Sequence, residues 1–254
     1  MSEEIRRVLA MASGLCSRED HTEAEKLIRE ALDQYPGNLD LKVMLGIILS
    51  RTERDREAEA VLRSVLKRDP DHEQATSALG RLLDNSLRTE EAESLYRGHL
   101  EMRPASHSVA DDLCRMLVEE ERSDEAYRIA KTQADRYPKE YEAYSALQHV
   151  LESVEDVIRE MTEEADFDRK NLTRLASNLI EQFEVIQKME KHVRKETPRA
   201  GDHIWELDEE VMRIAGELEY VDGEFKRHRA ALPANLQAAT KSIYTERDIR
   251  AKSK

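Results

Sequence analysis

Four prolines recur at an interval of 34 residues, and other columns of residues recur with them. An alanine stands twelve residues before each proline, a small residue stands 24 before it, and large apolar residues stand 25 and 21 before it. A fixed period of roughly 20 to 50 residues indicates stacked copies of one structural unit. The prolines are Pro36, Pro70, Pro104 and Pro138, the alanines are Ala24, Ala58, Ala92 and Ala126, and the small residues are Ala12, Gly46, Gly80 and Cys114.

The columns of each period predict two antiparallel helices. Large apolar residues spaced by four, with a small residue beside them, form an apolar stripe on the first helix. The small residue lets the second helix approach closely, and the alanine is its matching contact. The proline ends the second helix because it has no amide hydrogen to donate. One such pair cannot bury its apolar face alone, so we expect consecutive pairs to stack into a solenoid.

The series of leucine, small residue, large residue, alanine, aliphatic or aromatic residue and proline resembles the tetratricopeptide repeat family, whose period is about 34 residues. The resemblance covers residues 5–140 and implies repeats at 5–38, 39–72, 73–106 and 107–140, followed by a capping helix, in a first domain of residues 1–152. A fifth unit begins with Tyr144, Leu147 and Leu151, but Glu160 occupies the alanine column and Leu172 the proline column. This failure predicts a boundary.

From Leu147 onward, apolar residues alternate at steps of four and three as far as Val193, which is a heptad pattern. A second heptad series runs from Ile204 to Leu232, after a turn at residues 197–202. The two series predict a long helix that caps the solenoid and then folds back as an antiparallel coiled-coil hairpin, residues 153–233. Residues 234–254 are predicted to be a short helical or mobile basic tail. The predicted fold is therefore all-α throughout.

Three polar residues interrupt the heptad series: Asp168, Gln182 and His228. Asp168 and His228 fall one layer apart at the base of the predicted hairpin. They either form a buried ion pair that fixes the alignment of the two helices, or lie in water where the hairpin frays.

The charge balance argues against nucleic-acid and membrane binding. The 40 basic and 54 acidic residues give a net charge of −14, which repels phosphate backbones and anionic lipids. The C-terminal tail, with Lys241, Arg247 and Arg250, is a weak basic patch because acidic residues interrupt it. No stretch approaches the roughly 20 apolar residues of a membrane helix, and the N-terminus has no basic segment typical of a signal peptide. We therefore expect a cytoplasmic protein.

No residue pattern indicates catalysis, a metal site or a cofactor. The eight histidines have no paired spacing, and Cys16 and Cys114 are too far apart in the sequence to suggest metal ligands. The many pairs of adjacent glutamates are typical of solvated helix faces. We expect a protein that is not an enzyme and needs no cofactor.

In the family that the sequence resembles, the first helix of each pair lines a concave groove that receives a peptide. The resemblance places six residues on this face: Leu9, Val43, Ile47, Arg81, Arg115 and His149. Apolar residues at one end and basic ones further along predict a partner with apolar and acidic residues. The alternative is that the arginines are solvated surface residues among acidic neighbours. The positions that bind a terminal carboxylate in co-chaperones of this family hold residues that cannot form that clamp.

The predicted function is a non-catalytic scaffold or adaptor that binds a protein partner in this groove. Trp205, near the tip of the predicted hairpin, is either a second contact residue or a cover for the adjoining loop. The alternative function is structural, with the heptad helices joining two chains. A hairpin that satisfies its own apolar seam predicts a monomer, whereas a swapped helix predicts a coiled-coil dimer.

Overall fold

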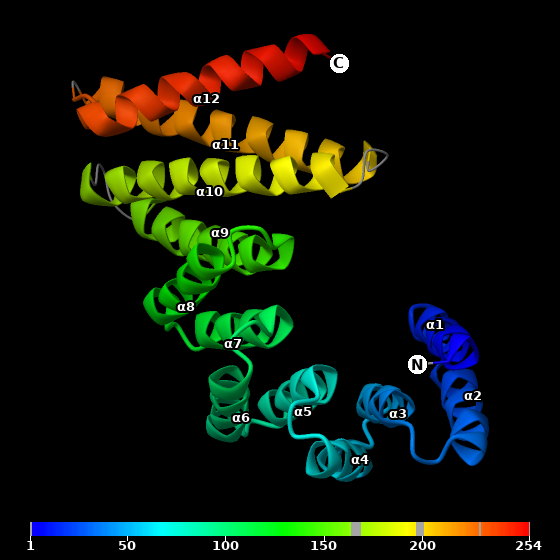
Figure 1. Ribbon diagram of the computed structural model, residues 1–254. Coiled ribbons are helices and arrows are strands. Elements are labelled where there is room, and N and C mark those ends of the chain that lie inside the picture. Colours follow the sequence, from blue (N-terminus) through cyan, green and yellow to red (C-terminus); the bar gives the residue numbers. More distant parts are fainter. Residues whose placement is uncertain (1, 164–168, 197–200, 229, 254) are drawn as a thin grey trace. The chain divides into compact units, whose positions relative to one another are not determined.

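A computed structural model describes residues 2–163, 169–196, 201–228 and 230–253, and the regular structure in these ranges is entirely helical (Figure 1). The all-α prediction is therefore confirmed. None of the described helices is long and apolar enough to cross a membrane. The helices are α1 Glu3–Cys16, α2 His21–Gln34, α3 Leu39–Arg51, α4 Asp55–Arg68, α5 Glu73–Asn85, α6 Thr89–Met102, α7 His107–Glu119, α8 Ser123–Arg136, α9 Tyr141–Glu163, α10 Arg169–Glu196, α11 Gly201–Arg227 and α12 Ala234–Ser253.

The first eight helices form four pairs, and each pair falls within one predicted repeat. The second helix of each pair ends two residues before its proline, as expected for a residue that cannot continue the hydrogen-bond ladder. The turn inside each pair contains a residue with a left-handed backbone. These residues, with φ angles of 64°, 59°, 58° and 61°, are Glu19, Glu53, Leu87 and Glu121. They repeat at the same interval of 34, but glycine, the usual signal for this conformation, occupies none of these positions.

The small residues of the repeat allow the two helices of a pair to approach closely. A Cβ atom added to Gly46 would lie 2.7 Å from Cγ of Leu62, and one added to Gly80 would lie 2.2 Å from the ring of Tyr96. The column of alanines on the second helices is fully buried. Shape complementarity between a small and a large residue therefore holds these pairs together.

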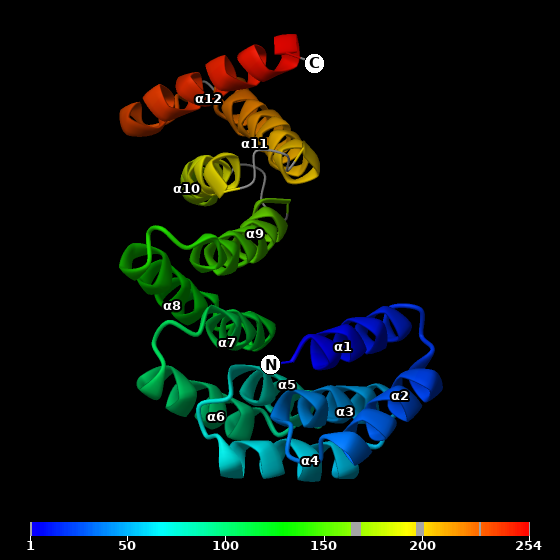
Figure 2. The same cartoon turned by 45° about the vertical axis from the view of Figure 1, so that its right-hand side comes forward.

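The chain divides into two compact units, residues 1–116 and 117–254. In the first unit, α3 packs against α1, α2, α4 and α5, so that each pair contacts the next. Figure 2 shows α1, α3 and α5 toward the inner side of this unit, and α2 and α4 along its outer side. The first helices of the pairs thus share one face.

In the second unit, consecutive helices continue to pack against each other beyond the predicted repeats. Contacts join α8 to α9, α9 to α10, α10 to α11, and α12 to both α10 and α11. The prediction of one long helix from residue 147 to residue 196 is wrong, because α9 and α10 lie against each other. The side-chain amide of Asn178 on α10 donates to the carbonyl oxygen of Leu151 on α9 across 3.0 Å. Helix pairing therefore continues where the sequence columns fail.

The helices α10 and α11 pack against each other as the heptad series predicted. Their apolar seam residues are buried, including Leu175, Leu179, Ile186, Val211, Ile214, Leu218 and Phe225. His228 is exposed and its ring nitrogen lies 3.9 Å from the Glu224 carboxylate, while Asp168 lies outside the described residues. The predicted pairing of Asp168 with His228 stays untested.

The C-terminal segment is more ordered than the predicted short or mobile tail, because α12 extends over 20 residues. Arg250 is nearly buried and its guanidinium lies 2.6 Å from the Glu190 carboxylate of α10 and 3.0 Å from that of Glu246. It also pairs with Asp208 of α11. Arg247 pairs with Glu219 in the same way. These contacts explain why the tail is not a free basic patch: its arginines attach α12 to its neighbours.

Candidate functional site

The apolar residues predicted for the groove differ in their accessibility. Leu9 on α1 and Ile47 on α3 are half-buried, so part of each side chain is available for contact. Val43 on α3 is only 4% exposed, and it belongs to the core. The prediction that Val43 lines an open groove is corrected for that reason: the packing around α3 covers the position that the repeat pattern assigns to the inner face.

Arg81 on α5 and Arg115 on α7 are exposed, and the charges of both act on a buried carboxylate, that of Asp112. Nη2 of Arg115 lies 2.5 Å from Oδ1 of Asp112. Arg81 acts on Asp112 only through its charge, and it makes no hydrogen bond or ion pair with another described residue. The sequence predicted both arginines, and the structure places them around one acidic group.

Asp112 is 5% exposed and links α7 to α5. The hydroxyl of Ser77 on α5 donates a hydrogen bond to its second oxygen, and Ser108 on α7 donates to Glu73 on α5 across 2.5 Å. Burial raises the pKa of the Asp112 carboxyl, against the opposing effects of the Ser77 hydrogen bond and of the Arg81 and Arg115 charges. The hydrogen bonds hold the two inner helices, and hence the two arginines, in a fixed relation.

Sequence reasoning missed Ser77 and Asp112 as members of this cluster. They are 35 residues apart, one more than the period, so a comparison of columns does not pair them. Their signal was the presence of polar residues in otherwise apolar stretches of the first helices. Both side chains are buried, which prevents them from acting on a substrate. Two exposed guanidinium groups near this carboxylate suit an acidic ligand, and the Asp111 carboxylate lies near the same cluster.

Arginines at the N-caps of the second helices contrast with Arg81. Arg54 lies 2.9 Å from the Glu25 carboxylate of the preceding pair and 2.7 Å from that of Glu57. Arg88 repeats this arrangement, with Glu59 at 2.8 Å and Glu91 at 2.5 Å. These ion pairs join successive repeats, and their charges are satisfied within the chain. Arg81, which has no ion pair with another described residue, is therefore the more available for a partner.

Two predicted contact residues fall elsewhere. His149 is exposed on α9, in the second unit, whereas Arg81 and Arg115 belong to the first. The side chain of Trp205 lies outside the described residues. Among the described residues, no group of three or more histidine, cysteine, aspartate or glutamate side chains could hold a metal ion. Cys16 and Cys114 are both buried.

Part of the repeat region matches a known family model. Residues 15–82 match the family model described as tetratricopeptide repeat. No curated protein matches the sequence. Among solved structures, a monomeric IFIT1 mutant with m7Gppp-AAAA has a TM-score of 0.54 and 14% identity, over 89% of this chain and 49% of that one. This likeness concerns the fold alone.

Two further alignments, each with a bacterial protein of solved structure, cover most of the length of that protein. A thermophilic TPR protein of Thermus thermophilus is 17% identical, with a TM-score of 0.49, over 69% of this chain and 98% of that chain. The pilF protein of Pseudomonas aeruginosa is 14% identical, with a TM-score of 0.48, over 77% of this chain and 92% of that one.

Proposed function

Because this chain is a tetratricopeptide repeat protein, we propose that it is a non-catalytic scaffold that binds a peptide or helix on the inner face of its repeats. Arg81 and Arg115 are the residues that carry the proposal. They bind an acidic residue of the partner, while Leu9 and Ile47 contact apolar residues nearer the N-terminal end. The exposed position of Arg81, with no ion pair to another described residue, is the observation that most favours this function.

The two arginines have different roles in this proposal. A partner carboxylate reaches Arg81 without displacing any ion pair. At Arg115 it competes with Asp112, which is buried and held by Ser77. Hydrogen bonds to charged groups contribute about 1.5–3 kcal/mol each, so losing the contact with Arg81 should weaken binding by about tenfold or more. Losing the contact with Arg115 should have a smaller effect.

A random peptide library selected on the full-length chain tests the proposal. The wild-type protein should enrich peptides that contain aspartate or glutamate beside apolar residues. The variant Arg81→Glu/Arg115→Glu should lose this enrichment. The control variant Arg56→Glu/Lys67→Glu makes the same change in net charge on the outer helix α4 and should keep it. Equal loss in both variants would show a general charge effect, and enrichment unchanged by the inner-face variant would exclude the arginines as the site.

The alternative function, oligomerisation through the heptad helices, has less support. Its apolar seam residues on α10 and α11 are buried within one chain, which favours a monomer. Native mass spectrometry separates the two functions, since a swapped helix would give a dimer at every concentration at which the protein folds. The two buried cysteines are compatible with the reducing conditions of the cytoplasm, which is the location that we propose.

A further inference from the structure

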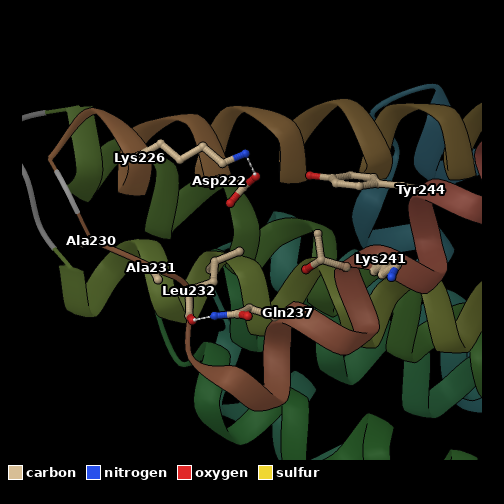
Figure 3. A pocket seen from close by; sticks show the side chains of 9 residues that line it. Asp222, Lys226, Ala230, Ala231, Leu232, Gln237, Lys241 and Tyr244 are labelled. Carbon is tan, nitrogen blue, oxygen red and sulfur yellow. Dashed lines mark hydrogen bonds and ion pairs between the residues drawn. The ribbon is translucent and has the colours of Figure 1, made fainter.

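A pocket of about 340 Å³ lies between α11, α12 and the segment that connects them (Figure 3). Its volume is in the range of small-molecule sites. Apolar groups from Ala230, Ala231 and Leu232 line the part formed by the connecting segment, and Asp222 and Tyr244 contribute polar groups from the two helices. The pocket is remote in sequence from the proposed peptide-binding face and is independent of that proposal.

The hydroxyl of Tyr244 is the unusual group in this pocket. Its oxygen is buried and has no hydrogen-bond partner among the described residues. Buried tyrosine hydroxyls usually have one. Burial, followed by the charges of Asp222 and Glu219, raises the pKa of Tyr244 to about 12. The hydroxyl therefore keeps its proton at neutral pH and is a hydrogen-bond donor.

Asp222 supplies the complementary group. Figure 3 shows the Tyr244 hydroxyl directed along α11 toward the Asp222 carboxylate. One oxygen of this carboxylate lies 2.5 Å from the ammonium group of Lys226, whose side chain is 73% exposed. The other oxygen accepts no hydrogen bond from a described residue. At this end of the pocket the Tyr244 hydroxyl is a donor and the second oxygen of Asp222 is an acceptor. The ammonium group of Lys226 lies beside them, and Lys241 also lines the pocket.

We propose that this pocket binds a small neutral molecule that carries a primary carboxamide on a compact apolar body. The carbonyl oxygen of the amide accepts the hydrogen bond of Tyr244, and its N–H group donates to Asp222. A carboxylate ligand would accept from Tyr244 but has no N–H group to donate to Asp222, whose charge opposes the attraction of Lys226 and Lys241 for such a ligand. An amidinium ligand would pair with Asp222 but would offer no acceptor to the tyrosine hydroxyl.

Three probes of the same shape separate these possibilities: benzamide, benzoate and benzamidine. Their affinities for the full-length protein can be measured by isothermal titration calorimetry or by ligand-observed NMR. Benzamide should bind most tightly of the three. Tyr244→Phe should lower the affinity for benzamide by about five- to tenfold, which is the usual effect of losing one hydrogen bond. Tyr220→Phe, which changes an exposed tyrosine of α11 outside the pocket, should leave the affinity unchanged.

Asp222→Asn provides a second variant that removes only the charge. It should weaken the binding of benzamide by a few-fold and strengthen the binding of benzoate, because the negative charge of Asp222 no longer repels the benzoate carboxylate. Thermal unfolding should show Tyr244→Phe to be at least as stable as the wild type, since the change removes an unpaired buried hydroxyl. Tighter binding of benzoate or benzamidine than of benzamide would overturn the proposed ligand class. Binding of none of the probes, or an equal benzamide affinity in wild type and Tyr244→Phe, would overturn the site.

Discussion

The two units of this protein join their helices by different means. In residues 1–116, the helices of a pair meet where a glycine faces a large side chain, as Gly46 faces Leu62 and Gly80 faces Tyr96. In residues 117–254, α9, α10 and α11 meet around the Glu155 carboxylate, which is 3% exposed. Gln182 donates to it across 2.8 Å, and the guanidinium groups of Arg159 and Arg213 lie 2.6 and 3.0 Å away.

The change occurs at one position of the repeat. The column that holds Ala12, Gly46, Gly80 and Cys114 continues at Gln148, which is buried and lies within 3.5 Å of the Gln182 side chain. A glutamine there does not allow the close approach that a glycine allows, and hydrogen bonds join α9 to α10 in addition to the buried apolar residues of this unit. Helices therefore continue to stack where the repeat pattern ends, because stacking requires buried contacts between neighbouring helices but does not require particular residue types.

The largest expected effect comes from filling the space beside a glycine. Gly80→Ala should destabilise the protein by about 3 kcal/mol, because the new methyl group overlaps the Tyr96 ring. Gly98→Ala is the matched control on α6, where a Cβ atom meets nothing within 4 Å, and should stabilise by about 1 kcal/mol. Urea unfolding measures both. Equal effects of the two changes would contradict the steric account of the first unit.

Removing the charge of Glu155 should have the next largest effect. Glu155→Gln keeps the shape of the side chain but leaves Arg159 and Arg213 without their buried counter-ion, at a cost of about 2 kcal/mol. Both arginines keep other carboxylate partners and are about one-third exposed, which limits the loss. The control, Asp156→Asn, changes an exposed neighbour and should have an effect below about 0.5 kcal/mol.

His99 is a buried titratable group of the first unit, and its protonation should make the stability of the protein depend on pH. It is 2% exposed and its ring nitrogens lie 3.1 Å from the Thr76 hydroxyl and 2.9 Å from that of Ser106. Burial lowers the pKa of His99, although Glu73 and Asp71 oppose the shift. In the unfolded chain the imidazole therefore takes up a proton at a higher pH than in the folded one.

The contribution of His99 to the free energy of unfolding should therefore be constant above a pH of about 6.5, which is the ordinary pKa of histidine. It should fall as the pH decreases toward the lowered pKa of the folded state, by at most about 1.4 kcal/mol per pH unit for one proton. Chemical denaturation of wild type and His99→Gln at a series of pH values isolates this contribution. If the two proteins show the same slope below pH of about 6.5, another group is responsible.

The smallest effect is expected at the turns. Leu87 has a φ of 58° and is 92% exposed, so its side chain contributes little packing while its backbone is in a conformation that glycine adopts more easily. Leu87→Gly should raise the free energy of unfolding by about 0.5–1 kcal/mol. Leu87→Ala keeps the unfavourable backbone and should show no such gain. Thermal unfolding of both variants distinguishes backbone strain from the removal of an exposed apolar side chain.

The sequence by itself determined the helical class, the four helix pairs of residues 5–140 and the ends of their second helices. It could do so because these features depend on the period of apolar and small residues and on the missing amide hydrogen of proline, which act locally or between adjacent helices. It also predicted Arg81 and Arg115, which stand one period apart, as partner-binding residues, and that role stays a prediction. These parts of the protein repeat along the chain, so a comparison of the repeats in the sequence is enough to predict them.

Only the tertiary structure decided which residues are available and which polar groups meet. It placed Val43 in the core, joined Ser77 to Asp112, turned α10 back along α9 and attached Arg250 to α10 and α11. These contacts join residues separated by intervals that follow no period. Whether a buried polar group is satisfied depends on the position of its partner in space, and a pattern of residue types along the chain does not contain that position.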